Sequence, residues 1–278
     1  MKNSKITFIG GGNMARSLIG GLIADGCNPQ NITVADPDNS QRNTLEDNFG
    51  VNTGADNQLA VADAKAVIFA TKPQVLRDIA IELKPALKES PDCLLISIAA
   101  GIRLNSLENW TGESHAIVRT MPNTPALVKC GATALYGNSK VTDDQHNLAE
   151  SIMRAVGLTL WLEDEVQMDA VTALSGSGPA YFFLVMEALE QAGEALGLSR
   201  ETSHLLTLQT AFGAAKMALE SREQAGLLRQ RVTSPGGTTE SAVNVLQREN
   251  ITEIFDSALK AAHSRSIELA DILGGNNG

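Results

Sequence analysis

The first half of the chain alternates between short apolar runs and longer amphipathic stretches. The apolar runs have the length of buried strands and lie at 6–10, 32–36, 66–71, 93–99 and 116–121. Between them, apolar residues recur every three or four positions, as helices require, over 13–25, 38–49 and 74–87. Strands that alternate with helices in this way predict a doubly wound parallel sheet that is covered by helices on both faces.

The pattern changes after about residue 164. A helix over 142–157 and a short strand over 158–163 end the alternating part, and only helical spacing follows. The stretch 179–196 is apolar on most of its faces, which indicates burial in a helical bundle or in a subunit interface. We therefore predict an α/β domain over 1–163 and an all-helical domain over 164–278.

The composition of the chain mainly excludes classes of protein and kinds of partner. The 278 residues carry a net charge of −10, which argues against nucleic acid or an anionic membrane as a partner. No apolar run reaches the ~18–20 residues of a membrane span, and the first residues lack a signal-peptide layout. The three cysteines are scattered and, with the four histidines, show no metal-ligand spacing. We expect reduced thiols, no metal site and a cytoplasmic location.

A glycine motif, Gly10-x-Gly12-x-x-Ala15, lies directly after the first strand and directly before the first helix. Gly10 permits a tight turn, Gly12 lets a pyrophosphate approach the backbone, and Ala15 allows close packing of helix and strand. The helix N-terminus offers N–H groups and a partial positive charge to the phosphates. Asp36 ends the second strand about 20 residues later, at the spacing of a ribose-binding acid. The motif and the acid together predict a dinucleotide site.

Asp36 leaves the choice of cofactor open. An acid at this position binds the ribose 2′-hydroxyl and repels a 2′-phosphate, which favours NAD over NADP. Arg42, Ser40 and Asn39 follow closely and could receive a phosphate, although a solvated helix residue is the more ordinary role for Arg42.

A second motif, TSPGGTT at 233–239, interrupts helical sequence near the end of the chain. The segment has the composition of a plain turn, because Pro and Gly end helices and Ser or Thr often caps the next one. The segment could also form an anion-binding site, or cradle, because free N–H groups and hydroxyls at a helix N-terminus bind anionic ligands.

Four further stretches narrow the field: ATKP (70–73), SIAAG (97–101), MPNTPA (121–126) and SGSGPAY (175–181). With GGGNMA at the front and TSPGGTTESAV near the end, the chain resembles the pyrroline-5-carboxylate reductase family. The match runs in order over essentially the whole chain, and its most specific element is the SPGGTT stretch. Enzymes of this family perform the last step of proline biosynthesis.

The resemblance implies a Rossmann domain followed by an all-helical domain that interlocks with a partner subunit, in a homodimer or a ring of dimers. It implies an oxidoreductase that acts on a CH–NH (imine) group and reduces 1-pyrroline-5-carboxylate to L-proline. The hydride donor would be NADPH or NADH, commonly NADPH. Relatives often carry a small hydroxyl residue at the position of Asp36, and this departure bears on the choice of cofactor.

The resemblance also implies the residues of the cofactor site. Gly10, Gly12, Asn13 and Met14 correspond to the pyrophosphate loop, and Ala35, Asp36 and Pro37 to the ribose edge. Asn57 corresponds to an adenosine contact. The walls near the nicotinamide correspond to Thr71, Lys72, Pro73, Ala99 and Ala100. Lys72 is also a rival proton donor, although the resemblance favours a role against the charge of the cofactor.

On the substrate side, the resemblance places the carboxylate at Ser234 and at the backbone N–H groups of the Gly236–Thr238 turn, which includes Gly237. The hydroxyl of Thr239, the catalytic candidate, would face the ring nitrogen. Glu165 lies near a position at which relatives contact the substrate, and a solvated acid is an equally good interpretation of it.

The chemistry needs few groups, because an iminium is already a strong electrophile and the enzyme mainly orients and encloses the reactants. Two alternatives stay open at this point. A β-hydroxyacid-type reductase would use a catalytic lysine early in its second domain, but residues 164–196 contain none. A nucleotide-sensing protein without catalysis would leave TSPGGTT without a role.

Overall fold

The computed structural model describes residues 4–275, which form two compact units. The first unit comprises the described residues of 1–177 and 262–278, and the second comprises 178–261. No helix among residues 4–275 combines the length and the apolar character that crossing a membrane would require.

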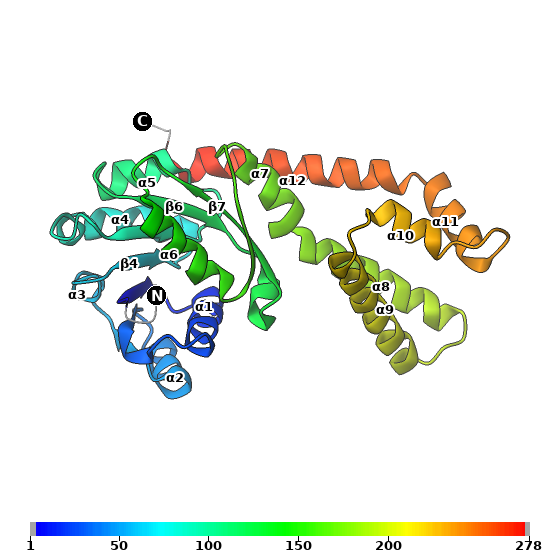
Figure 1. Ribbon diagram of the computed structural model, residues 1–278, viewed down its shortest axis with the longest axis horizontal. Coiled ribbons are helices and arrows are strands. Elements are labelled where there is room, and N and C mark those ends of the chain that lie inside the picture. The colour runs from blue at the N-terminus through cyan, green and yellow to red at the C-terminus, as the bar shows by residue number, and fades with distance from the viewer. Residues whose placement is uncertain (1–3, 276–278) are drawn as a thin grey trace. The chain divides into compact units, whose positions relative to one another are not determined.

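The first unit is built on an eight-stranded sheet with the order β3-β2-β1-β4-β5-β6-β7-β8. Figure 1 labels β4, β6 and β7 of this sheet. The strands are β1 Ile6–Ile9, β2 Ile32–Ala35, β3 Asn52–Gly54, β4 Ala66–Phe69, β5 Leu94–Ser97, β6 Ile117–Met121, β7 Gly131–Gly137 and β8 Gly157–Trp161. All neighbours are parallel except β6 and β7. The carboxyl ends of β1 to β5 therefore meet at one edge, and the chain leaves β1 and β4 in opposite directions there.

Helices cover both faces of this sheet. They are α1 Asn13–Ala24, α2 Asn39–Phe49, α3 Asn57–Ala60, α4 Pro73–Lys88, α5 Leu104–Thr111, α6 Asp143–Arg154 and α7 Gln167–Val171, followed by a π-helical turn at Thr172–Gly176. Side chains of α1 and α6 form one hydrophobic cluster with one face, and those of α4 and α5 form a second cluster with the other face. Because strand side chains alternate, Phe8 belongs to the first cluster and Ile9 to the second.

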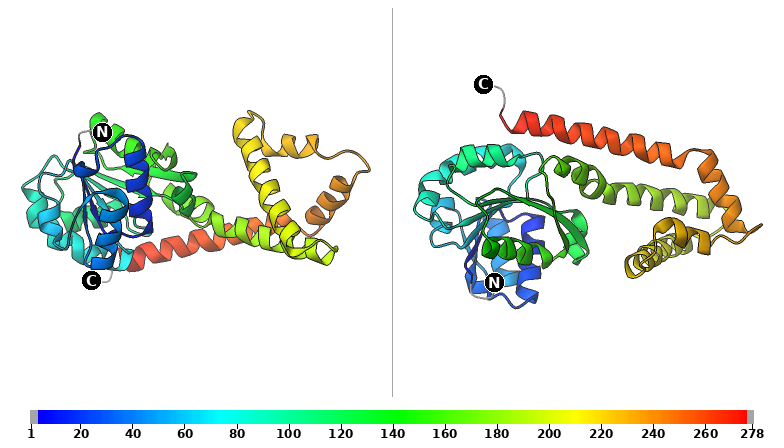
Figure 2. Two further views of the ribbon diagram at one scale, coloured as in Figure 1. Left: turned by 90° about the horizontal axis from the view of Figure 1, so that it is seen from below. Right: turned by 45° about the horizontal axis from the view of Figure 1, so that its top comes forward.

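The second unit contains helices alone, as Figure 2 shows from two further sides. Its elements are α8 Gly178–Ala195, α9 Arg200–Glu220, α10 Ala225–Arg231, α11 Thr238–Arg248 and the first part of α12 Ile251–Leu273, which returns to the first unit from residue 262. The predicted fold class, a doubly wound sheet followed by an all-α part, is confirmed.

Several details differ from the sequence-based expectation, among them the short helices α3 and α10, which were not predicted. The sheet is not wholly parallel, because the unpredicted strand β7 runs antiparallel to β6. Its sequence, GATALYG, is built of small residues and lacks the apolar run that marks a buried strand. The strand β3 and the helix α5 were also not predicted, since they span only three and eight residues. The change from strands to helices falls after β8, near the expected place. The division into domains at 163 and 164 stays a prediction, because the compact units separate at 177 and 261.

Apolar side chains of the second unit are exposed. In α8, Phe182 is 68% exposed and Phe183 64% exposed, and in α9, Phe212 is 62% exposed. Within this unit only Gly178 and Ser203 are buried. The burial expected for 179–196 is therefore not provided by the single chain, and the helical unit lacks a hydrophobic core of its own.

A buried histidine in the first unit links stability to pH. His115 is 1% exposed, and its Nδ1 has no hydrogen-bond partner among the described residues. Burial lowers the pKa of His115 below its ordinary value of 6.5, and a hydrogen bond with the Cys93 backbone opposes this shift in part. The fold thus favours the neutral ring.

We expect the free energy of unfolding to fall as the pH drops below about 6.5, because the unfolded state takes up a proton at His115 before the folded state does. The contribution is fully present above that pH. Urea unfolding at several pH values between about 7.5 and 5.5 measures it. His115→Asn, which cannot titrate, should flatten this dependence, and the control His263→Asn should not. Equal pH slopes for wild type and His115→Asn would contradict the assignment.

Candidate functional site

The glycine loop connects β1 to α1 and lies against the loop that follows β4. Gly10 has φ +100°, and a Cβ atom there would lie 2.7 Å from the carbonyl oxygen of Ala70. Only glycine permits both this backbone conformation and this approach. β1 and β4 are neighbours, so the two loops leave the sheet side by side at the point where its winding reverses. In sheets of this kind, ligands bind in the crevice at that point.

Gly12 precedes α1 without any side-chain cap. The first intrahelical bond runs from the N–H of Arg16 to the oxygen of Gly12, so the N–H groups of Asn13, Met14 and Ala15 have no helical acceptor. A Cβ atom on Gly12 would meet nothing within 4 Å, so the space beside this backbone is open. Free donors and open space are what a pyrophosphate needs.

Asp36 turns its carboxylate toward the glycine loop. Its Oδ2 accepts the N–H of Gly11 at 2.7 Å, and its Oδ1 accepts the N–H of Asp38 at 2.9 Å. Arg42 is not a freely solvated residue, since its Nη1 donates to the carbonyls of Asp36 and Pro37 at 2.6 and 3.0 Å. A cation and an acid therefore lie together at the end of β2, the expected ribose edge.

The remaining predicted cofactor residues follow neighbouring strands. Thr71, Lys72 and Pro73 follow β4, Ala99 and Ala100 follow β5, and Asn57 follows β3. The hydroxyl of Thr71 is buried and has no hydrogen-bond partner among the described residues, although its methyl group borders the space at Gly10. A buried hydroxyl without a partner is uncommon, and a ligand at this edge would satisfy it.

The TSPGGTT segment lies in the second unit and combines features of a turn and of a cradle. Gly236 has φ +71° and donates its N–H to Oε2 of Glu240 at 2.7 Å. Gly237 donates to the carbonyl of Ser234 at 3.0 Å and precedes α11 without a side-chain cap. The turn thus uses the N–H groups of both glycines.

Donors nevertheless stay free at this helix start. The first helical bond runs from Ser241 to Gly237, so the N–H groups of Thr238 and Thr239 have no helical acceptor. Both residues are exposed in the chain by itself, and no described residue bonds the Thr239 hydroxyl. Within the predicted carboxylate cradle, Thr238 therefore offers a free N–H group, whereas that of Gly237 is engaged.

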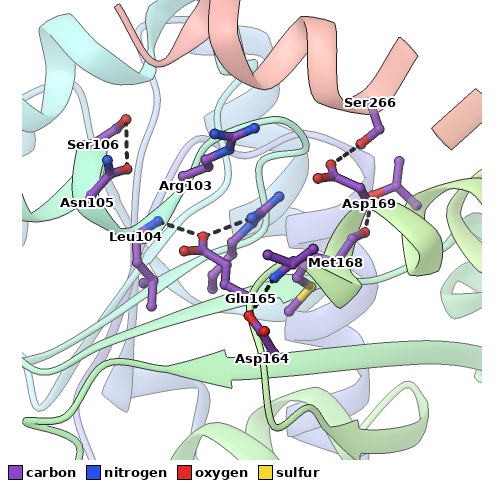
Figure 3. Close-up of polar contacts among 12 residues, drawn as sticks. Arg103, Leu104, Asn105, Ser106, Asp164, Glu165, Met168, Asp169 and Ser266 are labelled. Carbon is purple, nitrogen blue, oxygen red and sulfur yellow. Dashed lines mark hydrogen bonds and ion pairs between the residues drawn. The ribbon is translucent and has the colours of Figure 1, made fainter. Parts of the chain in front are cut away.

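Glu165 takes part in a partly buried ion pair that sequence reasoning missed (Figure 3). Its Oε1 accepts the Nη1 of Arg119 and the N–H of Leu104, each at 2.8 Å. Arg119 lies in β6 and is 3% exposed. The only sequence signal was a charged residue inside the apolar run AIVRTM. Glu165 is thus not a freely solvated acid, and its proposed contact with substrate stays a prediction.

A hollow of about 430 Å³ lies beside this pair and is lined by Arg103, Asn105, Arg119, Glu165, Val166, Asp169 and Ile267. Its two cations are paired within the chain, Arg119 with Glu165 and Arg103 with Asp271 at 3.3 Å. Asp169 accepts a hydrogen bond from Ser266 at 2.6 Å (Figure 3). Among residues 4–275, no group of three or more His, Cys, Asp or Glu side chains could hold a metal ion.

Comparison with known proteins identifies the family. A family model described as pyrroline-5-carboxylate reductase dimerisation matches residues 165–269, and one described as NADP oxidoreductase, coenzyme F420-dependent, matches 5–101. The pyrroline-5-carboxylate reductase of Pseudomonas aeruginosa is 52% identical over 274 residues, which cover 99% of this chain and 100% of the relative. The chain belongs to the pyrroline-5-carboxylate reductase family.

Other members of the reductase family agree with this assignment. The enzyme of Arabidopsis thaliana is 41% identical over 96% of this chain and 95% of its own length. The solved reductase structure from Coxiella burnetii has a TM-score of 0.93 and 50% identity, and covers 96% of this chain and 99% of that one. The Plasmodium falciparum reductase, solved with NADP bound, has a TM-score of 0.86 and 31% identity, and covers 97% and 99%.

The two glycines of the loop should respond differently to alanine. Gly12→Ala places a methyl group in open space, so we expect a thermal midpoint within about 2 °C of wild type and an affinity for NADP⁺ at least about tenfold lower. Gly10→Ala meets Ala70 at positive φ and should lower the stability by about 1–3 kcal/mol. Calorimetric titration and thermal unfolding measure both effects. Unchanged NADP⁺ affinity in Gly12→Ala would show that the dinucleotide lies elsewhere.

Proposed function

We propose that this chain reduces 1-pyrroline-5-carboxylate to L-proline with NADPH or NADH, the final step of proline biosynthesis. The observation that carries the proposal is the match over full length to reductases of this name, at 52% identity in one relative. The glycine loop and the SPGGTT segment support it, because both present backbone donors to the kinds of anion that this reaction requires.

The residues at the carboxyl edge of the sheet fit a nicotinamide dinucleotide. The uncapped start of α1, the open space at Gly12 and the unpartnered hydroxyl of Thr71 all lie on that edge. The pyrophosphate would be held by Gly10, Gly12, Asn13 and Met14. When bound, the cofactor supplies the hydride. The NADP in the Plasmodium falciparum relative supports NADPH as one donor.

The substrate carboxylate would bind at the start of α11. The free N–H groups of Thr238 and Thr239 and the hydroxyl of Ser234 are the donors for it. The Thr239 hydroxyl would bond the ring nitrogen and hold its proton in place. Because an iminium needs little activation, orientation by these donors and exclusion of water account for most of the protein's contribution.

Purified protein tests the proposal directly. Loss of NADPH absorbance should depend on added pyrroline-5-carboxylate, and L-proline should accumulate. A β-hydroxyacid-type reductase would instead act on a β-hydroxyacid, and a sensing protein would bind the dinucleotide without oxidising it. Either result in place of proline formation would overturn the proposal.

The proposal includes a homodimer, or a ring of dimers, as the working form. The exposed phenylalanines of α8 and α9 support it, since large apolar side chains that lie exposed on neighbouring helices often mark a protein–protein interface. The dimerisation model that matches 165–269 covers the same helices. Light scattering should find at least a dimer at assay concentration, and an active monomer would contradict it.

A cytoplasmic location is also proposed, since Cys27, Cys93 and Cys130 are unpaired.

Asp36 should set the balance between the two cofactors. Its negative charge at the ribose edge repels a 2′-phosphate, so Asp36→Asn should raise the NADPH to NADH ratio of kcat/KM about tenfold, or ~1.4 kcal/mol. Asparagine retains an oxygen for the Gly11 N–H group. Asp38→Asn is the matched control, because it removes an equal charge two residues away and keeps a good helix cap. A ratio that stays constant in Asp36→Asn would mean that Asp36 serves the glycine loop alone.

Thr239→Val separates the hydroxyl from the shape of the side chain. If that hydroxyl bonds the ring nitrogen in the transition state, kcat should fall by about tenfold to a hundredfold, below the larger losses seen when an oxyanion donor is removed. Thr239→Ser restores the hydroxyl and should recover much of the rate. Ser234→Ala should instead raise the substrate KM more than it lowers kcat. If Thr239→Val keeps the wild-type kcat, Thr239 has only a structural role in the first turn of α11.

A further inference from the structure

Glu165 connects the two ends of one loop of the first unit. The loop is the β5–α5 segment, residues 98–103, which leaves the sheet at Ser97 and enters α5 at Leu104. Ser97 is the register partner of Arg119 in the neighbouring strand β6. Since Oε1 of Glu165 bonds both Arg119 and the Leu104 N–H, the carboxylate joins a point beside the start of the segment to its end. We call these two bonds the Glu165 clasp.

The α5 helix depends on this outside acceptor. Its N-cap residue, Arg103, makes no side-chain cap, so the Leu104 N–H has no local partner. A carboxylate at this place satisfies the donor and also opposes the positive end of the helix dipole. The ion pair between Arg103 and Asp271 is half exposed and contributes little.

The segment lies at the edge where the dinucleotide is proposed to bind. Its first residues are held near β4, because Ile98 donates to the carbonyl of Phe69 at 3.2 Å and Ala99 donates to Oγ of Ser97 at 3.3 Å. Its later part turns at Gly101, φ +71°, where a Cβ atom would come within 3.2 Å of Leu273. Small residues in a fixed path are suited to forming a wall against a planar ring, provided that the far end is also held.

The ion pair with Arg119 holds the Glu165 carboxylate in place. A guanidinium that is 3% exposed requires a counter-ion, and Glu165 is the acid that contacts it. The two bonds of Oε1 hold the carboxylate against Arg119 and the start of α5, while Glu165 also lines the adjacent hollow.

We propose that Glu165 is a positioning residue, which through Leu104 holds the β5–α5 segment in the shape that receives the nicotinamide end of the cofactor. It acts without touching substrate or cofactor. This role rests on the proposed function for its purpose, but the clasp itself can be tested without any ligand.

Hydrogen exchange on the ligand-free full chain tests the clasp. In Glu165→Ala, amides of residues 98–105 should exchange about tenfold faster than in wild type, while those of β1 and β4 should not change. Glu165→Gln keeps an oxygen for the Leu104 N–H, so exchange in this segment should stay within about threefold of wild type, although the thermal midpoint falls because Arg119 loses its counter-ion. Glu163→Gln, which removes a charge two residues away, is the matched control and should change neither.

A double variant keeps the test informative if Glu165→Ala folds poorly. Glu165→Ala leaves Arg119 buried and unpaired, whereas Arg119→Met combined with Glu165→Ala removes the clasp without a buried charge. This double variant should be more stable than Glu165→Ala and show the same faster exchange at 98–105. Faster exchange spread evenly over the sheet, in either variant, would overturn the clasp in favour of general destabilisation.

Cofactor and substrate measurements test the purpose of the clasp. In Glu165→Ala the Kd for NADP⁺ should rise about tenfold while the substrate KM stays within about twofold, and Glu165→Gln should restore most of the affinity. A raised substrate KM with unchanged NADP⁺ affinity would overturn the positioning role and make Glu165 a substrate ligand. If the wild type bound no NADP⁺, the proposed function and the purpose of the clasp would both fail, and the exchange data would still decide whether the clasp holds the segment.

Discussion

The first N–H groups of a helix require acceptors, and this constraint distinguishes two groups among the helices of the chain, apart from starts such as that of α4 at Lys72, which fit neither. In the first group the chain supplies the acceptor: Asp38 caps α2, Asp56 caps α3, Thr142 caps α6 and Ser199 caps α9. Glu165 does the same for α5 from 61 residues away. In the second group, α1 and α11 begin after a glycine that has no side chain to offer. Donors left free in this way are the ones available to a ligand.

This division explains which parts of the site could be read from the sequence. The starts of α1 and α11 are visible because their signals are local: Gly10 adopts φ +100°, which favours glycine, and Gly236 and Gly237 form a turn within a few residues. The parallel strands other than β3 were visible as apolar runs for a similar reason. Secondary structure of this kind follows from neighbours along the chain.

Features that depend on distant contacts were not visible. The burial of Arg119 and its pairing with Glu165 join residues 46 positions apart, and no local period encodes such a pair. The direction of the Asp36 carboxylate depends on the Gly11 N–H group, 25 positions away. Strand β7 escaped notice because its small side chains are buried only by the elements that pack around them. Sequence therefore predicted the strands and the glycine turns better than it predicted the bonds between distant residues.

The local donors also resolve an apparent conflict of charge. The chain carries a net charge of −10, yet the proposed reaction brings together an anionic dinucleotide and a carboxylate substrate. Charges on the protein surface are screened over about 8–10 Å at moderate salt. The N–H groups at a helix start act within hydrogen-bond distance, where they contribute directional bonds and a partial positive charge. Two uncapped helix starts can therefore bind two anions on an acidic protein, which needs no cluster of lysine or arginine for the purpose. An uncapped start loses little when no ligand is present, because water satisfies an exposed N–H group, as at Thr238 and Thr239.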